Sequence, residues 1–189
     1  NTSSELDLME RHPKMDYVFL PFNVDNFTTT FNSGHPLRIC HATRDRYWKG
    51  SDAIIEACQK LEKSHGIIFD LIENQPYQET LRRKALADIY IDQVANLGGW
   101  GYGMNSVEAL SMGVACATNL LQQYEAFIPD HPFCNVSKAS LYEDLVAFVE
   151  NPDKIATLKK SGRAWVEKTH SIQAVIKQVY KLYERENWV

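Results

Sequence analysis

The stretch LRICHATRDRYWKGSDAIIEACQKLEKSHGIIFDLI, residues 37–72, carries a complete strand–helix–strand pattern. Its two apolar runs, residues 37–42 and 67–72, are typical of strands buried on both faces of a sheet. Ser51 is suited to cap the helix between them, and Gly66 is suited to end it. The apolar face of that helix contains Ile54, Ile55, Ala57, Cys58 and Leu61.

The same alternation continues on both sides of this unit. Further short strands are expected at residues 17–22, 89–91, 114–117 and 133–136. Helices are expected from Pro76 to residue 86, from the glycine loop to Gly113, near 120–127, and at 141–150, 152–168 and 172–184, the last capped by Ser171. Strands that alternate with helices predict an α/β fold, with a parallel sheet covered by helices on both faces. Ligands of such sheets bind outside the carboxyl ends of the strands, here after Ala42, Ile72 and Ile91.

Composition narrows the class of protein. The chain has 189 residues, is 44% hydrophobic and carries a net charge of −4, which fits one globular domain at residues 17–189 after a polar segment at 1–16. We expect no nucleic-acid partner, because the sequence shows no clustered basic surface of the kind that nucleic acids need, although a local basic site for a phosphate is compatible with it. We also expect no integral membrane segment, because no apolar run approaches about 20 residues. The four cysteines lack metal-ligand spacing, which predicts no metal site and a reducing, cytoplasmic location.

The loop after the first strand of this unit gathers basic side chains. Arg44, Arg46 and Lys49 lie between a predicted strand and the start of a helix. A helix N-terminus already attracts anions, and arginine and lysine both bind phosphate oxygens. The loop therefore predicts a diphosphate site, although a solvated basic loop would look the same.

A glycine-rich loop, GGWGYG at residues 98–103, precedes the helix that contains Glu108. Glycines let a ligand approach the main chain, but the dinucleotide fingerprint GxGxxG is absent. Trp100 and Tyr102 are suited either to stacking on a base or sugar or to packing over the sheet edge. Glu108 is suited to accept hydrogen bonds from ribose hydroxyls, or it is an ordinary solvated acid.

Taken in order, these segments resemble the C-terminal, donor-binding domain of retaining GT-B glycosyltransferases of the family 4 type. Thr43-Arg44 with Lys49-Gly50 resembles the family's Gly-Arg…Lys-Gly segment. The run WGYGMNSVEALSMG, residues 100–113, resembles its Glu-x7-Glu motif, and ADIYIDQ, residues 87–93, resembles the strand before it. LPFNVD, residues 20–25, resembles the entry into the domain. The resemblance covers residues 17–185.

The resemblance implies a role for each matched residue. Arg44 and Lys49 would hold the donor diphosphate and stabilise the leaving nucleotide, and Glu108 would bind the ribose. Residues 71–73 would border the base. The donor-binding set comprises His41, Arg46, Trp100, Gly101, Tyr102, Gly103, Met104, Asn105 and Glu108.

Two features depart from the family pattern. Trp100 stands where the family usually has the first Glu of its pair. A second branch, with a His-Ala-x-x-x-Arg-x-x-Lys-Gly segment, aligns Arg46 rather than Arg44 with the phosphate and turns His41 toward the site. The choice between the two arginines stays open at this point. No segment matches the N-terminal acceptor-binding domain.

The leading hypothesis is therefore retaining, metal-independent transfer of a hexose-like group from a nucleoside diphosphate sugar, without a further cofactor. A partner half would supply the acceptor site and any peripheral membrane contact, so the isolated domain should turn over poorly. One alternative is a nucleotide-sugar epimerase or hydrolase of the same fold, which would use His41 and His131. The other is a non-catalytic binding or scaffold domain.

Overall fold

The computed structural model describes residues 16–31, 36–97, 101–125, 127–128 and 130–189 of the chain. Most of the predicted segment 1–16 and the predicted site residue Trp100 lie outside these ranges. The strands are β1 (Arg38–Thr43), β2 (Ile68–Glu73), β3 (Ile89–Ile91), β4 (Ala115–Thr118) and β5 (Cys134–Asn135). The helices are η1 (Val24–Asn26), α2 (Arg46–Lys49), α3 (Ser51–His65), α4 (Tyr77–Lys84), α5 (Met104–Ser111), α6 (Gln122–Glu125), α7 (Leu141–Val149), α8 (Pro152–Thr169) and α9 (Ile172–Arg185).

The five strands form one parallel sheet in the order β2-β1-β3-β4-β5. In its register Thr43 lies opposite Glu73, and His41 lies opposite Ile91. The carboxyl ends of β1, β2 and β3 therefore meet along one edge of the sheet. The prediction of a parallel α/β sheet is confirmed.

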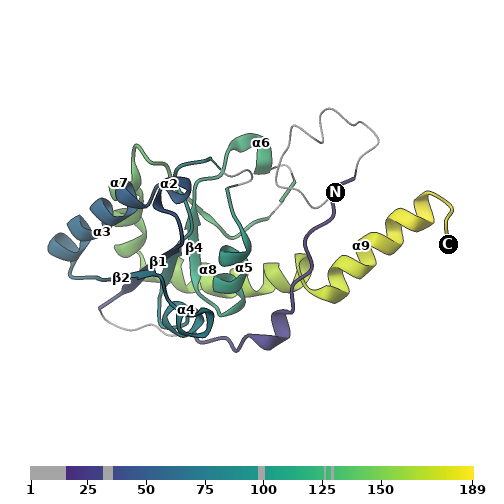
Figure 1. Cartoon of the computed structure of the whole chain (residues 1–189), viewed down its shortest axis with the longest axis horizontal. Coiled ribbons are helices and arrows are strands. Elements are labelled where there is room, and N and C mark those ends of the chain that lie inside the picture. Colours follow the sequence, from purple (N-terminus) through teal and green to yellow (C-terminus); the bar gives the residue numbers. More distant parts are fainter. Residues whose placement is uncertain (1–15, 32–35, 98–100, 126, 129) are drawn as a thin grey trace.

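Helices cover both faces of this sheet (Figure 1). On one face α3 and α7 bury an apolar cluster that includes Ile54, Leu61 and Leu145. On the other, α4, α5 and α8 bury a second cluster around Tyr90 and Leu110. The four cysteines are divided between these clusters, and all of them are buried and free. Burial on both faces explains why the strands are continuous apolar runs in the sequence.

The prediction of a strand at residues 17–22 is wrong. This segment is extended, but only Phe22 forms a β-bridge, and its partner is Ser171 rather than the sheet. Pro21 has no N–H to donate to a ladder, and Phe19 packs edge-on against Trp165 at 6.3 Å between ring centroids. Apolar residues there serve an aromatic cluster instead of a sheet.

The start of α3 also differs from the prediction. Gly50, with φ +68°, is the N-cap, and Ser51 is the first helical residue. The Ser51 hydroxyl does not cap the helix; its Oγ lies 2.7 Å from Nε2 of His41. The preceding loop contains the short helix α2, because the Asp45 side chain accepts a hydrogen bond from the N–H of Tyr47.

Two other predicted helix boundaries are confirmed. Gly66 ends α3 in the left-handed conformation, with φ +64°. Ser171 caps α9 by accepting a hydrogen bond from the N–H of Ala174.

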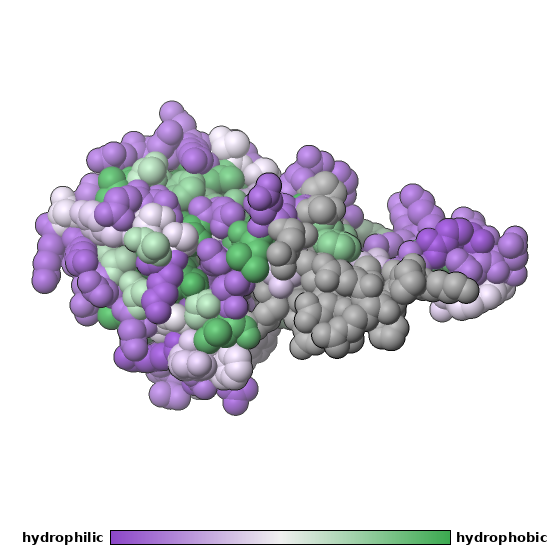
Figure 2. Space-filling view, turned by 90° about the horizontal axis from the view of Figure 1, so that it is seen from above, coloured by the Kyte–Doolittle hydropathy of each residue, from purple (hydrophilic) through white to green (hydrophobic). Residues whose placement is uncertain are grey.

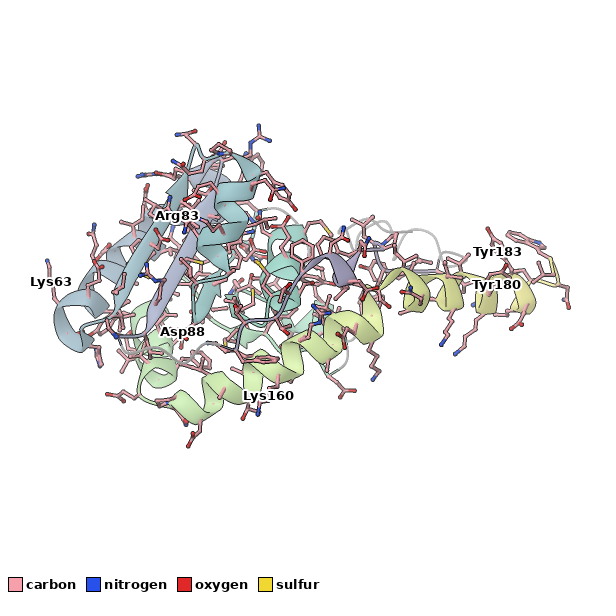
Figure 3. The ribbon with its side chains drawn as sticks, turned by 90° about the horizontal axis from the view of Figure 1, so that it is seen from below. Lys63, Arg83, Asp88, Lys160, Tyr180 and Tyr183 are labelled. Carbon is pink, nitrogen blue, oxygen red and sulfur yellow. The ribbon has the colours of Figure 1, made fainter. Side chains whose placement is uncertain are left out.

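Beyond that cap α9 projects from the body of the molecule, and the face of it that Figure 2 shows is hydrophilic. Tyr180 and Tyr183 lie on this projecting part (Figure 3).

No helix in the described ranges combines the length and the apolar character that a bilayer crossing requires.

Candidate functional site

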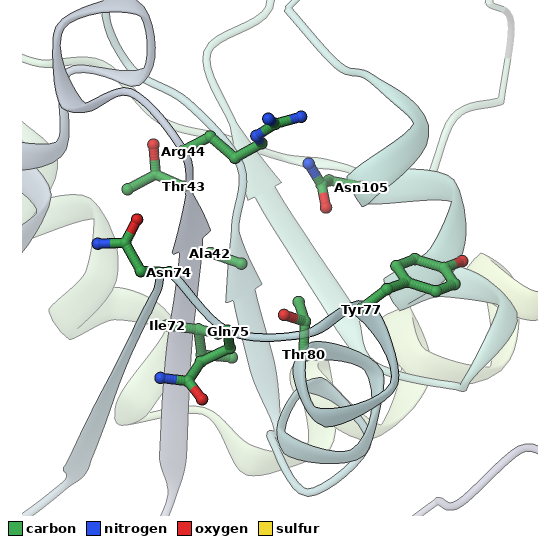
Figure 4. A pocket seen from close by; sticks show the side chains of 9 residues that line it. All are labelled: Ala42, Thr43, Arg44, Ile72, Asn74, Gln75, Tyr77, Thr80 and Asn105. Atoms are coloured by element: carbon green, nitrogen blue, oxygen red, sulfur yellow. The ribbon is translucent and has the colours of Figure 1, made fainter.

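A cavity of about 600 Å³ opens at the carboxyl ends of β1 and β2, between the first turns of α4 and α5 (Figure 4). Its volume is within the range of small-molecule sites. Both chain turns that follow the strands contribute to it, as the parallel-sheet rule predicts. The lining residues are Ala42, Thr43, Arg44, Ile72, Asn74, Gln75, Tyr77, Thr80 and Asn105.

Arg44 extends its guanidinium group across this cavity toward Asn105 (Figure 4). The side chain is exposed, and it forms no ion pair or hydrogen bond with the described part of the chain. An arginine without an internal partner keeps its five N–H donors for a ligand. Arg44 is thus an open cationic group on the cavity wall.

Arg46 is arranged differently. Its Nε and Nη2 donate to the two carboxylate oxygens of Glu73, at 2.8 and 2.7 Å, and Nη1 lies 3.7 Å from Asp52. The hydrogen bond from Arg46 lowers the pKa of Glu73. Arg46 does not line the cavity, so its charge is balanced beside the site rather than within it.

Lys49 joins the basic loop to the glycine loop through Asp92. Its Nζ pairs with one oxygen of this fully buried carboxylate, and the other oxygen accepts hydrogen bonds from the Gly103 N–H and the Ser106 hydroxyl. Burial by itself raises the pKa of Asp92, but the charge of Lys49 and these hydrogen bonds outweigh it and lower the pKa. Asp92 therefore fixes the relative position of two predicted motifs.

His41 lies beneath the site and does not reach the cavity. Its Nδ1 is 2.8 Å from the Ile91 carbonyl, its Nε2 bonds Ser51, and the residue has no exposed surface. Burial lowers its pKa. The second predicted histidine, His131, lies 3.7 Å from Glu125, and neither of these two lines the cavity.

The glycine loop packs closely against the end of β4. Gly101 adopts φ +87°, and a Cβ on it would lie 2.1 Å from the Asn119 carbonyl oxygen, so only glycine fits there. The Tyr102 ring packs on Phe133, with 4.9 Å between centroids, and its hydroxyl is 3.2 Å from Nε2 of His170. Tyr102 thus fills the packing role rather than facing the cavity. Met104 likewise packs against the core.

Glu108 lies at the back of the site and is only 8% exposed. Its Oε2 accepts a hydrogen bond from Lys84 Nζ at 2.6 Å, and its Oε1 accepts one from the Tyr77 hydroxyl at 3.0 Å. Asn105 accepts a second hydrogen bond from Lys84, also at 2.6 Å. The sequence analysis did not identify Lys84 or Tyr77. A lysine on the same helix as the apolar residues Leu81 and Ala85 was the available signal.

The described residues contain no group of three or more His, Cys, Asp or Glu side chains that could hold a metal ion.

No protein-family model and no curated protein matches this sequence. The Rossmann-like α/β fold itself matches solved glycosyltransferase structures. Sucrose-phosphate synthase from Thermosynechococcus elongatus has a TM-score of 0.67 and 14% identity over 97% of this chain and 57% of its own. TarM from S. aureus, in a complex that contains UDP, has a TM-score of 0.66 and 11% identity over 95% and 42%. HepE from Anabaena, in complex with UDP-glucose, has a TM-score of 0.64 and 12% identity over 90% and 57%.

Identities this low establish a common fold and no more. The chain spans between 42% and 57% of the length of these three proteins.

Proposed function

We propose that this chain is the donor-binding domain of a glycosyltransferase and binds a nucleoside diphosphate sugar. The observation that carries the proposal is the cavity at the carboxyl edge of the sheet, whose wall includes Arg44, a cation that pairs with no described residue. Matching folds with UDP or UDP-glucose bound, in TarM and HepE, support a nucleotide ligand. The sequence motifs around Lys49 and Glu108 support the same ligand.

Different residues of the cavity and its surroundings would contact different parts of the nucleotide sugar. Arg44 and the N-terminal turn of α5 would hold the diphosphate, because both offer N–H donors to an anion. Lys49 would add its charge at the same edge, and Glu108 would accept from the ribose. The base would lie over Ile72 and beside Thr80.

Catalysis in this scheme is stabilisation of the leaving group. When the glycosidic bond to the diphosphate breaks, negative charge grows on the phosphate oxygens, and cations held in advance lower the barrier. The transfer would proceed with retention and without a metal ion, to an acceptor held by a further domain of the GT-B type. Trp100, in place of a family Glu, would lie near the sugar.

A binding domain without transferase activity is the second candidate. The specific observation in its favour is that Lys49 and Arg46 already have carboxylate partners, Asp92 and Glu73. Arg44 is then the cation that the described residues leave open on the cavity. Such a domain would bind the nucleotide sugar and leave it intact.

Calorimetric titration of the chain with UDP, GDP, ADP and UDP-glucose tests the proposal. One nucleotide should bind, and Arg44→Gln should weaken it by about tenfold or more, because a charge-assisted hydrogen bond contributes about 1.5–3 kcal/mol. Arg46→Gln removes an equal charge from beside the cavity and should have a much smaller effect. A folded chain that binds none of these nucleotides would contradict the proposal. If Arg46→Gln lowers nucleotide affinity more than Arg44→Gln does, Arg46 rather than Arg44 binds the phosphate.

A further inference from the structure

Lys84 is an unusual residue for a domain core. It ends α4, and it has no exposed surface. Its ammonium group lies 4.9 Å from the centre of the Tyr90 ring, within the second apolar cluster of the sheet. Lysine is almost never fully buried unless its charge is paired, because removing the charge from water costs several kcal/mol. The pairing partner of Lys84 is therefore central to its role.

That partner is the predicted ribose-binding residue. Lys84 Nζ donates to Glu108 Oε2 and to Asn105 Oδ1, both at 2.6 Å. Asn105 lines the cavity, and Glu108 stands one helical turn behind it on α5. The ion pair thus connects α4 to the α5 side of the cavity and fixes where the Glu108 carboxylate lies.

Tyr77 covers the other oxygen of this carboxylate. Its hydroxyl donates to Glu108 Oε1 at 3.0 Å, and the residue is 54% exposed and lines the cavity. An ionised carboxylate has about four acceptor positions on its two oxygens, and Lys84 and Tyr77 use two of them. A ligand hydroxyl would reach Oε1 by taking the place of the hydroxyl of Tyr77, a residue that is itself more than half exposed.

We propose that Lys84 is a positioning residue: it holds the Glu108 carboxylate oriented to accept the vicinal hydroxyls of a ribose, one of which would replace the Tyr77 hydroxyl at Oε1. The inference rests on the proposed nucleotide-binding function and names the part of the nucleotide that Lys84 serves. Lys84 itself does not touch the ligand.

The chain contains a matched control for the loss of a buried lysine. Lys159 on α8 is 3% exposed, and its Nζ lies 2.6 Å from the buried carboxylate of Asp88. Asp88, labelled in Figure 3, directly precedes β3, so its carboxylate lies at the amino end of that strand, whereas the cavity lies at the carboxyl edge of the sheet. Lys159→Met therefore removes a buried charge without reaching the site.

The test is calorimetric titration of the chain with UDP and with 2′,3′-dideoxy-UDP, which lacks both ribose hydroxyls. Wild type should bind UDP about tenfold or more tightly than the dideoxy compound, as expected for hydrogen bonds to a charged group. Lys84→Met should remove most of this preference while leaving affinity for dideoxy-UDP nearly unchanged. Lys159→Met should keep the wild-type preference.

The Tyr77→Phe variant adds an effect of opposite sign. Without its hydroxyl, Tyr77 no longer competes for Glu108 Oε1, so UDP should bind more tightly while dideoxy-UDP should not. A merely structural role for Lys84 predicts equal losses for both ligands, or the same loss in Lys159→Met, and either result would overturn the inference.

Two further outcomes separate the inference from the proposed function. If wild type binds both ligands equally, the role of Lys84 is overturned while nucleotide binding stands. If wild type binds neither, the proposed function fails and the inference fails with it.

Lys84→Met leaves Glu108 without its cation, and the variant can fail to fold for that reason alone. The double variant Lys84→Met/Glu108→Gln removes both charges of the pair and avoids this problem. If Lys84 acts only through Glu108, the double variant should bind UDP as Glu108→Gln does. If the double variant binds UDP more than about threefold more weakly than Glu108→Gln, Lys84 also acts by another route, and the inference is overturned. A difference of that size exceeds the roughly 0.5 kcal/mol within which the effects of independent sites normally add.

Discussion

The polar residues around the cavity differ in whether their charge is available to a ligand. Lys49 and Arg46 have carboxylate partners within the domain, whereas Arg44 has none among the described residues. Glu108 is held on both of its oxygens. Partners decide these roles more than residue type does, because a paired charge must exchange one interaction for another when a ligand arrives.

His41 gives a pH dependence that can be measured at this scale. Burial lowers its pKa in the folded chain, while the unfolded chain titrates near 6.5. Below that value the unfolded state takes up a proton that the folded state refuses, so the free energy of unfolding falls as the pH falls. The slope contributed by one such histidine reaches about 1.4 kcal/mol per pH unit.

Urea unfolding between pH 8 and pH 5 measures this slope. The His41→Gln variant should be less stable at pH 8 and should show a smaller decline toward pH 5, because its amide does not titrate. His170, also buried with a lowered pKa, should retain its own part of the slope. An identical decline in wild type and His41→Gln would show that His41 does not cause it.

At the scale of elements, the segment before the sheet is fastened by one arginine of α8. Arg163 Nη1 donates to the carbonyls of Phe27, at 2.9 Å, and Ser111, at 2.6 Å, and lies 3.3 Å from the Val24 carbonyl. A single guanidinium group thus joins η1 and the end of α5 to α8. Without it these carbonyls lose a charged donor in a partly buried place.

Arg163→Met keeps most of the side-chain volume and removes these bonds. We expect a loss of about 2–4 kcal/mol in unfolding free energy and faster amide exchange in residues 22–30. Hydrogen exchange by mass spectrometry reads the segment directly. Arg82→Met, which removes an exposed pair with Glu79 on α4, is the control and should change little. Unchanged exchange in residues 22–30 would mean that aromatic packing alone holds the segment.

Periodic elements were predictable from the sequence, and context-dependent ones were not. The apolar period of α3 and the continuous run of β1 follow from burial, and both appear where the pattern placed them. Residues 17–22 have the same apolar character but lie beside α8 and α9 rather than the sheet. The local sequence pattern predicts that a segment is buried, but the element against which it packs depends on the rest of the chain.

In the candidate site, too, the residues placed by local motifs were predictable, and their partners far away in the sequence were not. The motifs brought Arg44 and Asn105 to one cavity, as expected of strand ends and helix starts. The pairs Lys49–Asp92 and Lys84–Glu108 join residues 43 and 24 positions apart, and no local pattern marks such partners. His41 was expected at the site because of the motif around it, but its side chain points beneath the sheet edge into the core.

At the scale of the whole molecule, the cavity of the described domain lies at one edge of one sheet. The domain covers 57% or less of the length of the three solved glycosyltransferases compared with it. Transfer needs a donor, an acceptor and a site closed to water, since a bound sugar must react with the acceptor rather than with solvent. Under the proposed function, the cavity at the carboxyl edge of the sheet would provide the donor site alone.

We therefore predict that the 189-residue chain binds its nucleotide sugar and turns it over very slowly. The measurement is release of free nucleotide from the nucleotide sugar selected by calorimetry, followed over hours with wild type and Lys49→Met. Release should stay near the uncatalysed rate in both, because leaving-group stabilisation without a positioned acceptor lowers only part of the barrier. Sustained release that Lys49→Met abolishes would show instead that this domain alone holds the groups needed for hydrolysis, which would favour the hydrolase interpretation over a donor domain that depends on a partner.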